Sequence, residues 1–377
     1  MIYDLRQRLP NIKNNLGARR ILVLVPSFDS YGGISHYFQV LRPHFSLPVD
    51  YFFRGVRTQH SKFSRLMYPI IQMLDYLHFF LKLILGDYSF VHLNTSFGWT
   101  GLIRDYCFIL ITRLLKKPYI VFFRGIDTRV VAQIEKRFVR QFRNSFLKAD
   151  RILVLSNELM NTLKQMQPDC RVTLETTVVD EKMVDQCNQK GIAEKLDHNN
   201  RVFLFLARLE KAKGTYETIE AFKLVQNKYP DIQLNICGDG KELIKVQSEV
   251  GNNPNITLHG FVTGEEKKNV FSSADIYLFP SYAEGMPNSV LEAIAFGLPV
   301  ITTPVGGLVD FFVDRKMGLF VEQKNAQDLA AKMIYLIENP TLALEMGLHN
   351  FQYARSHFYS SVVAARLENY YNEIING

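Results

Sequence analysis

The sequence has few of the residues that build metal centres and disulfide frameworks. Its four cysteines are Cys107, Cys170, Cys187 and Cys237, and they form no C-x-x-C pair and have no histidine nearby at metal-ligand spacing. Scattered thiols in a chain of 377 residues are typical of a reducing compartment. The first residues, Met-Ile-Tyr-Asp-Leu-Arg-Gln-Arg, lack the apolar run of a signal peptide, so we expect a cytoplasmic protein.

Long apolar runs are also scarce. The stretch 66–85 alone approaches the length of a membrane span, but it contains Pro69, Asp75, His78 and Lys82. A charge at mid-bilayer costs at least about 2.5 kcal/mol, so we exclude a transmembrane helix. Two readings remain: a buried or half-buried helix of the first domain, or an interfacial helix resting on lipid. The second is favoured by nearby basic and aromatic residues: Arg54, Arg57, Lys62, Arg65, Tyr68, Tyr76, Phe79 and Phe80.

Two common ligand motifs are missing. No G-x-G-x-x-G follows the first apolar strand, where the chain reads Pro26-Ser-Phe-Asp-Ser-Tyr-Gly-Gly-Ile34, so a nicotinamide-type pyrophosphate site is not indicated. Gly238-Asp239-Gly240 also lacks the third glycine and is typical of a tight turn. There is no D-x-D motif suited to a divalent ion. We therefore expect no metal and no resident cofactor.

The charge is unevenly distributed. Residues 1–195 hold 28 of the 44 Lys and Arg residues and 16 of the 37 Asp and Glu residues, a formal charge of +12, whereas residues 196–377 carry −5. The basic half is expected to meet an anionic partner, such as a membrane surface, a phosphorylated lipid or nucleic acid. No basic–aromatic binding motif or zinc spacing is present, so we do not expect nucleic acid.

Short apolar runs alternate with longer helical patterns, which predicts parallel βαβ units. Strands are expected at Arg20–Val25, Phe90–Leu93, Tyr119–Phe123, Ile152–Leu155, Val202–Ala207, Gln233–Cys237, Ile256–Leu258, Ile276–Phe279 and Val300–Thr302. Helices are expected at Phe97–Leu115, Val130–Leu147, Thr215–Lys228, Lys241–Val250, Gly264–Ser273, Ser289–Phe296, Ala326–Glu338 and from Leu342 to the end. The polar stretch Asn188–Asn200 reads as a linker. The pattern predicts two doubly wound α/β domains with ligands at the carboxyl ends of the strands.

Two loops carry chemistry at such strand ends. In Ala207–Gly214 (ARLEKAKG), Arg208 and Lys213 lie between a strand and a helix, an arrangement suited to a diphosphate, although a solvated basic loop is an equally fair reading. In Pro280–Glu292 (PSYAEGMPNSVLE), Asn288 or Ser289 can cap the following helix. Glu292 points back toward the loop, where two carboxylates, Glu284 and Glu292, are expected to converge on one site. Taken alone, Glu292 could also be an ordinary acid of a first helical turn.

These segments carry a family likeness. RLEKAKG (208–214), NICGDG (235–240), SYAEGMPNSVLEA (281–293) and GLPVITTPVGG (297–307) follow the order seen in glycosyltransferase family 4, also called glycosyl transferases group 1, which the sequence resembles. The likeness is strong over 201–338 and weaker over 20–163. It implies the GT-B architecture, two Rossmann-like domains facing a central cleft, and sugar transfer with retention of configuration.

The resemblance also assigns roles. It implies that Arg208 and Lys213 bind the donor diphosphate, that Glu284 contacts the donor sugar, and that Glu292 holds the ribose. Backbone groups of Gly285, Met286, Pro287 and Asn288 would contact sugar and phosphate, Gly32 and Gly33 would let the first domain approach the ligands, and Val262 would border the nucleobase. Family members often carry a His where this chain has Arg124, which stays protonated and could grip an anionic group instead.

By the same likeness, residues 1–190 form an acceptor-binding domain, 191–355 a nucleotide-sugar-binding domain, and 356–377 a helix that packs back toward the first domain. The expected acceptor is a saccharide or a lipid-linked saccharide in cell-surface polysaccharide, lipopolysaccharide or other glycoconjugate synthesis, with an anionic membrane surface as a further partner. Association with the inner face of the cytoplasmic membrane is left open. The alternatives are a degenerate GT-B protein that binds nucleotide-sugar without turnover, and a GT-B sugar-nucleotide epimerase.

Overall fold

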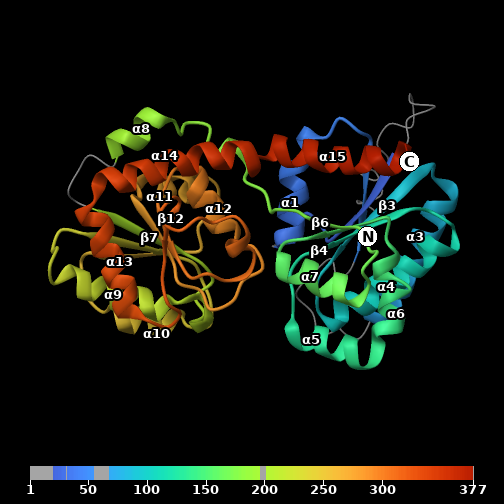
Figure 1. Cartoon of the computed structure of the whole chain (residues 1–377), viewed down its shortest axis with the longest axis horizontal. Helices are drawn as coiled ribbons and strands as arrows, with labels where there is room; N and C mark the ends of the chain where they lie inside the picture. The colour runs from blue at the N-terminus through green and yellow to red at the C-terminus, as the bar shows by residue number, and fades with distance from the viewer. Residues whose placement is uncertain (1–19, 31, 55–67, 196–200, 377) are drawn as a thin grey trace, which may run out of the picture.

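The chain forms two α/β domains that lie side by side (Figure 1). The computed structural model describes residues 20–30, 32–54, 68–195 and 201–376. Each domain is built on a parallel six-stranded sheet with helices on both faces. The expected pair of doubly wound domains is therefore confirmed.

The N-terminal sheet has the order β2-β1-β3-β4-β5-β6. Its strands are β1 (Arg20–Val25), β2 (Val49–Phe53), β3 (Tyr88–Thr95), β4 (Tyr119–Phe123), β5 (Arg151–Val154) and β6 (Val172–Leu174). Its helices are α1 (Gly33–Leu41), α3 (Tyr68–Leu85), α4 (Trp99–Leu114), α5 (Thr128–Gln133), a π-helix (Ile134–Phe138), α6 (Val139–Arg143) and α7 (Asn157–Met166), with short 3-10 turns at Arg42–His44, Phe146–Lys148 and Glu181–Met183.

The C-terminal sheet has the order β12-β11-β10-β7-β8-β9, the arrangement of a dinucleotide-binding fold. Its strands are β7 (Val202–Leu206), β8 (Gln233–Cys237), β9 (Ile256–Gly260), β10 (Ile276–Phe279), β11 (Val300–Thr302) and β12 (Gly318–Phe320). Its helices are α8 (Gln189–Lys195), α9 (Thr215–Gln226), α10 (Leu243–Val250), α11 (Gly264–Ser273), α12 (Asn288–Ala295), α13 (Ala326–Glu338) and α14 (Pro340–His357), with 3-10 turns at Lys211–Lys213 and Gly306–Asp310. The final helix is α15 (Ser360–Asn376).

Alternation along the strands divides the core between two faces. In β1, Ile21 and Val23 join the cluster that contains α1 and α15, whereas Leu22 and Leu24 join the cluster under α4. Successive side chains of a strand point to opposite faces, so a strand covered on both sides must be apolar throughout. This is why residues 21–25 (ILVLV) are a continuous apolar run.

The chain crosses between the domains twice, and the two crossings touch. Val179, on the first crossing, forms a parallel bridge with Tyr359 on the second, and its N–H donates to the Phe358 carbonyl over 2.8 Å. After the second crossing, α15 lies along the N-terminal domain beside α1 (Figure 1). The last helix of the sequence is thus part of the first domain's core.

Buried polar contacts hold α15 in place. The hydroxyl of Tyr371 lies 2.7 Å from Nδ1 of His92 on β3, and both residues are fully buried. Burial lowers the pKa of His92 well below its usual value, so the imidazole is neutral at physiological pH. Arg366 of α15 forms an ion pair with the buried Glu175, just after β6.

Several boundaries differ from those expected. The strands β2, β6 and β12 were not predicted; they lie at or near sheet edges and carry half-buried residues. The predicted linker Asn188–Asn200 was wrong for its first half, because α8 forms there and its Ile192 packs on Phe351 of α14. The single helix predicted over Val130–Leu147 is divided by the π-helix.

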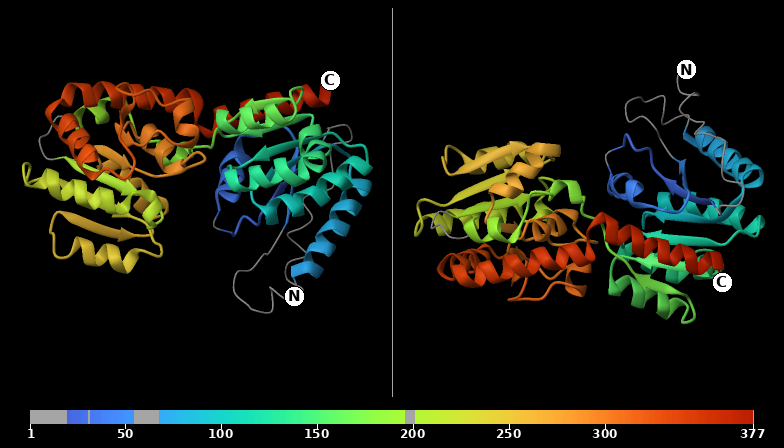
Figure 2. Two further views of the ribbon diagram at one scale, coloured as in Figure 1. Left: turned by 60° about the horizontal axis from the view of Figure 1, so that its bottom comes forward. Right: turned by 90° about the horizontal axis from the view of Figure 1, so that it is seen from above.

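The helix α3 presents two different faces. Phe79 and Leu83 are buried against α4 and the sheet, while an apolar stripe at Ile70, Met73, Leu74, Leu77, Leu81, Ile84 and Leu85 is exposed. Figure 2 shows α3 (light blue) on the outer side of its domain, away from the C-terminal domain. No helix in the described parts of the chain is long and apolar enough to cross a bilayer. The basic residues Arg57, Lys62 and Arg65 lie outside the described residues.

Candidate active site

The two predicted loops meet where the C-terminal sheet changes winding direction. The loop 207–214 follows β7 and the loop 280–287 follows β10, and these two strands are neighbours. Connections from them run to opposite sides of the sheet, which leaves a crevice at their carboxyl ends. The topology alone therefore brings Arg208, Lys213 and Glu284 to one edge.

Gly214 allows the two loops to touch. Its φ is +76°, and a Cβ there would lie 2.2 Å from the Pro280 carbonyl oxygen, so no other residue fits without displacing the backbone. The contact is closed by a hydrogen bond from the Tyr282 N–H to the Ala212 carbonyl over 2.8 Å. Lys213, next to Gly214, is thereby directed at the loop of Glu284.

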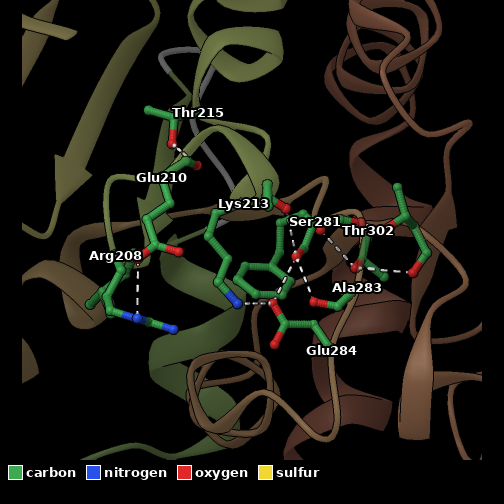
Figure 3. Close-up of polar contacts among 12 residues, drawn as sticks. Arg208, Glu210, Lys213, Thr215, Ser281, Ala283, Glu284 and Thr302 are labelled. Atoms are coloured by element: carbon green, nitrogen blue, oxygen red, sulfur yellow. Dashed lines mark hydrogen bonds and ion pairs between the residues drawn. The ribbon is translucent and has the colours of Figure 1, made fainter. Parts of the chain in front are cut away.

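Lys213 and Glu284 form a partly enclosed ion pair (Figure 3). The Lys213 Nζ lies 2.5 Å from Oε1 of Glu284, with 16% and 11% of the two side chains exposed. The Ser281 hydroxyl donates to the same Oε1 over 2.7 Å. Both hydrogen bonds fall on one oxygen, which leaves Oε2 of Glu284 available for a ligand hydroxyl.

Arg208 belongs to the same loop as Lys213 and is much more exposed. Its Nη1 donates to Oε1 of Glu210 over 3.1 Å, and 73% of its side chain is exposed (Figure 3). An exposed ion pair such as Arg208–Glu210 contributes little free energy, so the guanidinium can turn toward a bound anion at little cost. Lys213 is thus held in place, whereas Arg208 is free to reorient.

Glu292 is buried and only half satisfied. The side chain is 3% exposed, and its Oε1 accepts from Nζ of Lys267 on α11 over 2.6 Å. Its Oε2 is buried without a hydrogen-bond partner. A buried carboxylate oxygen normally accepts a hydrogen bond, so Oε2 is an acceptor that a ligand hydroxyl could satisfy. Each of the two carboxylates is thus paired with its own lysine, Glu284 with Lys213 and Glu292 with Lys267.

The start of α12 differs from the prediction. Asn288 and Ser289 do not cap the helix; Pro287 is the N-cap residue and provides no side-chain hydrogen bond. The first N–H groups of the helix therefore have no side-chain acceptor and face the loop of Glu284. Such N–H groups and the positive end of the helix dipole favour an anion.

Glycines bring the two domains together beside Glu284. A Cβ on Gly285 would lie 3.5 Å from Cα of Gly125, which follows β4 in the N-terminal domain. Gly306 has a φ of +56°, and a Cβ there would lie 2.0 Å from the Glu284 carbonyl oxygen. The N–H of Gly307 donates to the Gly285 carbonyl over 2.6 Å. The backbone of Glu284 and Gly285 is therefore clamped between both domains.

Other predicted residues lie in varied surroundings. A Cβ on Gly32 or Gly33 would meet nothing within 4 Å, so the local fold requires neither glycine and the space beside them is open. The Sδ of Met286 faces the N-terminal domain and accepts from the Thr177 N–H over 3.4 Å. Val262 is buried in the core, and its neighbour Phe261 is 62% exposed.

Arg124 is held inside the N-terminal domain. Its Nε and Nη2 donate to Oδ1 of Asn94 over 3.1 and 2.8 Å, and its guanidinium lies 3.9 Å from the Tyr37 ring centre and 3.6 Å from that of Phe122. Burial lowers its pKa to about 10, so the group stays charged at neutral pH. The next residue, Gly125, lies close to Gly285 of the C-terminal domain.

Some site residues were missed by the sequence analysis. Lys267 and Ser281 hold the two carboxylates, but partners from separate elements leave no periodic signal. His36 lies in the first turn of α1; burial lowers its pKa, and the charges of Glu292 and Lys267 reach it from the other domain. The pair Gly306-Gly307, a few residues after β11, lies in a segment quoted for the family likeness, but the sequence analysis gave it no role.

Among the described residues, no group of three or more His, Cys, Asp or Glu side chains could hold a metal ion. The ion pairs at this edge are Arg208–Glu210, Lys213–Glu284 and Lys267–Glu292. We compared the part of the chain that carries these ion pairs with known proteins. Residues 189–352 match the family model of glycosyl transferases group 1. The C-terminal half of the chain is therefore similar to this family.

Curated relatives match in the same region. The chain is 28% identical over 185 residues to the capsular polysaccharide biosynthesis glycosyltransferase CapM of Staphylococcus aureus, covering 48% of each protein. It is 27% identical over 218 residues to the putative teichuronic acid biosynthesis glycosyltransferase TuaC of Bacillus subtilis, covering 56% of this chain and 53% of TuaC. The chain thus spans about half the length of the curated relatives it matches.

Solved structures match over almost the whole chain. Sucrose-phosphate synthase from Thermosynechococcus elongatus superposes with a TM-score of 0.72 at 16% identity, covering 95% of this chain and 99% of that one. HepE of Anabaena, in complex with UDP and glucose, gives a TM-score of 0.69 at 14% identity, covering 94% and 100%. At such identities the likeness shows the fold, and it confirms the predicted GT-B architecture.

The Lys267–Glu292 pair makes a prediction about stability. Lys267→Met leaves the buried carboxylate without its cation and should lower the free energy of unfolding by about 3–5 kcal/mol. Adding Glu292→Gln removes the stranded charge and should recover much of that loss. Urea unfolding of the two variants measures both effects. The neighbouring Lys268→Met is the control, because its partner Asp185 is exposed and the loss should be smaller; equal losses in the two single variants would contradict the assignment.

Proposed function

We propose that the chain is a glycosyltransferase that takes a sugar from a nucleoside-diphosphate-sugar donor. The observation that carries this proposal is the buried, half-satisfied carboxylate of Glu292 at the start of α12. A ribose hydroxyl is a neutral donor of the size and polarity that Oε2 lacks. In a nucleotide the diphosphate is attached to the ribose. With the ribose at Glu292, the diphosphate would lie near the N-terminus of α12 and near Arg208 and Lys213 of the loop after β7.

The leaving group explains the cations. Negative charge builds on the diphosphate as the glycosidic bond breaks, and Lys213, Arg208 and the helix N–H groups would stabilise it in an enclosed site. Lys213 would do so from a fixed position, and Arg208 would close over the bound anion. Glu284 would accept a hydroxyl of the donor sugar through its second oxygen. No metal ion and no cofactor are needed in this scheme.

We further propose retention of anomeric configuration. No side chain is nominated as a nucleophile; the acceptor would attack on the face from which the diphosphate departs, and a phosphate oxygen would take its proton. The acceptor would enter from the N-terminal domain, beside Gly32, Gly33 and Gly125. Arg124, charged and fixed between aromatic rings, would favour an anionic sugar or acceptor there.

The acceptor is proposed to be a saccharide or a lipid-linked saccharide of a cell-surface polysaccharide or glycoconjugate. CapM and TuaC, by their names, act in capsular polysaccharide and teichuronic acid synthesis. HepE was crystallised with UDP and glucose, which makes a uridine nucleotide the first donor to test. The proposed location is the cytoplasm, at the inner face of the membrane.

An exposed apolar face in the basic N-terminal half of the chain motivates the membrane assignment. The exposed stripe of α3 recurs at Ile70, Leu74, Leu77 and Leu81, the spacing of one helix face. Helix α4, packed beside it, exposes Ile103, Leu110 and Leu114 at the same kind of spacing. Exposed apolar residues on two neighbouring helices of the basic half fit an anionic interface, with the helices lying on the lipid rather than crossing it.

Nucleotide binding is the first test. A panel of uridine, guanosine, adenosine and cytidine diphosphates and NAD is added without metal, and thermal unfolding is followed. One nucleoside diphosphate should raise the melting temperature, because it binds only the folded protein. Glu292→Ala should abolish the shift, while Glu338→Gln, an exposed acid of the same domain, should keep it. No shift with any nucleoside diphosphate, or a shift with NAD alone, would refute the donor site.

Turnover tests the cations. Lys213→Ala and Arg208→Ala should each reduce release of nucleoside diphosphate from the donor by about 10²–10³-fold, since each removes a group that stabilises developing charge. Lys211→Ala, an exposed lysine of the same loop, is the matched control and should keep activity. A chelator should leave the wild-type rate unchanged. Near-normal turnover in both variants would overturn the roles, and epimerised donor without transfer would indicate an epimerase.

Vesicle flotation tests the membrane surface. The protein should float with phosphatidylcholine vesicles that contain phosphatidylglycerol and much less with phosphatidylcholine alone, and salt should weaken the binding. Leu77→Glu with Leu81→Glu on the α3 stripe should abolish flotation. Ile244→Glu, at a residue 82% exposed on α10, is the control and should float normally. Absence of binding to anionic vesicles at low salt would remove the assignment.

A further inference from the structure

A pocket of about 830 Å³ lies in the N-terminal domain, away from the donor loops. One wall is α4, and the other is formed by α5, the π-helix and α6. Its volume falls within the range of about 300–1,000 Å³ that is usual for small-molecule sites. Neither Lys213 nor Glu284 nor any other residue of the C-terminal domain lines it.

The walls of the pocket are chiefly apolar and aromatic. They include Trp99 and Ile103 on α4 and Phe138 and Phe142 on the opposite wall. Trp99 packs edge-on against Phe138, with ring centres 5.3 Å apart, and its indole N–H donates to Gln133 over 2.6 Å. The one polar atom of the indole is therefore already satisfied, and the ring presents hydrocarbon to the pocket. Such a lining favours an apolar chain over a sugar.

The wall that contains the π-helix also carries positive charge. Lys136 and Arg137 both line the pocket and are exposed, and they belong to the π-helix. The wide turns of a π-helix occur mostly as single turns and often at functional sites. An occupant with a hydrocarbon body and an anionic end would match both parts of this lining.

The pocket connects two surfaces already described. Ile103 lines it and also belongs to the exposed apolar stripe of α4, which packs beside α3. Trp99 begins α4 directly after β3, and α5 begins after the Arg124–Gly125 turn, at the carboxyl ends of the strands. Figure 1 shows α5 on the side of the domain turned toward the C-terminal domain, and α3 on the far side. The pocket thus lies between the proposed membrane face and the acceptor side of the cleft.

We propose that this pocket binds the hydrocarbon chain of a lipid-linked acceptor, with Lys136 and Arg137 holding the phosphate that joins chain and saccharide. The proposal rests on the proposed function, because it names the acceptor of that site. The lipid would lie along α4, and its phosphate would place the saccharide toward Gly125 and the donor loops.

Trp99 allows a direct test, since it is the single tryptophan of the sequence. Farnesyl phosphate, used below its micelle concentration, is titrated against the full-length protein while tryptophan fluorescence is recorded. A saturable change is expected, with farnesol binding more weakly and inorganic phosphate giving no change. No saturable change with farnesyl phosphate, or equal affinity for farnesol, would overturn the proposal.

Substitutions distinguish binding in the pocket from non-specific binding of the lipid to exposed apolar surface. Ile103→Glu places a charge in the apolar wall at an exposed position and should weaken farnesyl phosphate by about tenfold or more. Leu114→Glu is the matched control, because Leu114 is 72% exposed on the same helix and does not line the pocket. Lys136→Gln with Arg137→Gln should erase the preference for farnesyl phosphate over farnesol. Equal weakening by Leu114→Glu would refute the site.

The same samples separate this inference from the donor site. Nucleoside-diphosphate stabilisation of Ile103→Glu should equal that of the wild type, because the variant lies in the other domain. Lipid binding without nucleotide binding would refute the proposed function and leave a lipid-binding pocket. Nucleotide binding without any lipid effect on Trp99 would refute the pocket and leave the donor site intact.

Discussion

The candidate site depends on a close contact between two backbones, and that contact depends on Gly214. With a φ of +76° and the Pro280 carbonyl against its Cα, this residue lets the loop after β7 lie on the loop after β10. Lys213 then forms its ion pair with Glu284. Gly306 does the same from the other side, where it lies against the Glu284 carbonyl. Small residues thus fix the backbone, and the ionic groups follow from it.

The ionic groups themselves are arranged in matched pairs rather than as a free cluster. Each carboxylate keeps one oxygen on a lysine and offers the other, so the protein holds its charges without a ligand and still has acceptors left over. This differs from a site that is simply positive. An incoming diphosphate would compete with Glu284 for Lys213, and the binding of the anion would therefore release that carboxylate for the sugar.

Much of the fold could be predicted because its strands are covered on both faces. The runs ILVLV (21–25) and VFLFLA (202–207) are apolar throughout for that reason, and their alternation with helical patterns indicated the two doubly wound domains. The strands β2, β6 and β12 were not predicted; β6 and β12 are only three residues long, and β2 has a single buried residue, so none of them gives a long apolar run. In the site, residue types beside strand ends pointed to Arg208, Lys213, Glu284 and Glu292. Lys267 could not be found this way, since only the packing of α11 on α12 brings it to Glu292.

The position of α15 has a consequence for how the protein is made. The sheet of the first domain is complete once residue 174 has been synthesised, but one of its faces is closed by Tyr371 and its neighbours at the end of the chain. During synthesis, the apolar face that α15 covers therefore stays uncovered until the second domain has been translated and α15 has left the ribosome. The core of the N-terminal domain is therefore completed only after the C-terminal domain has been synthesised.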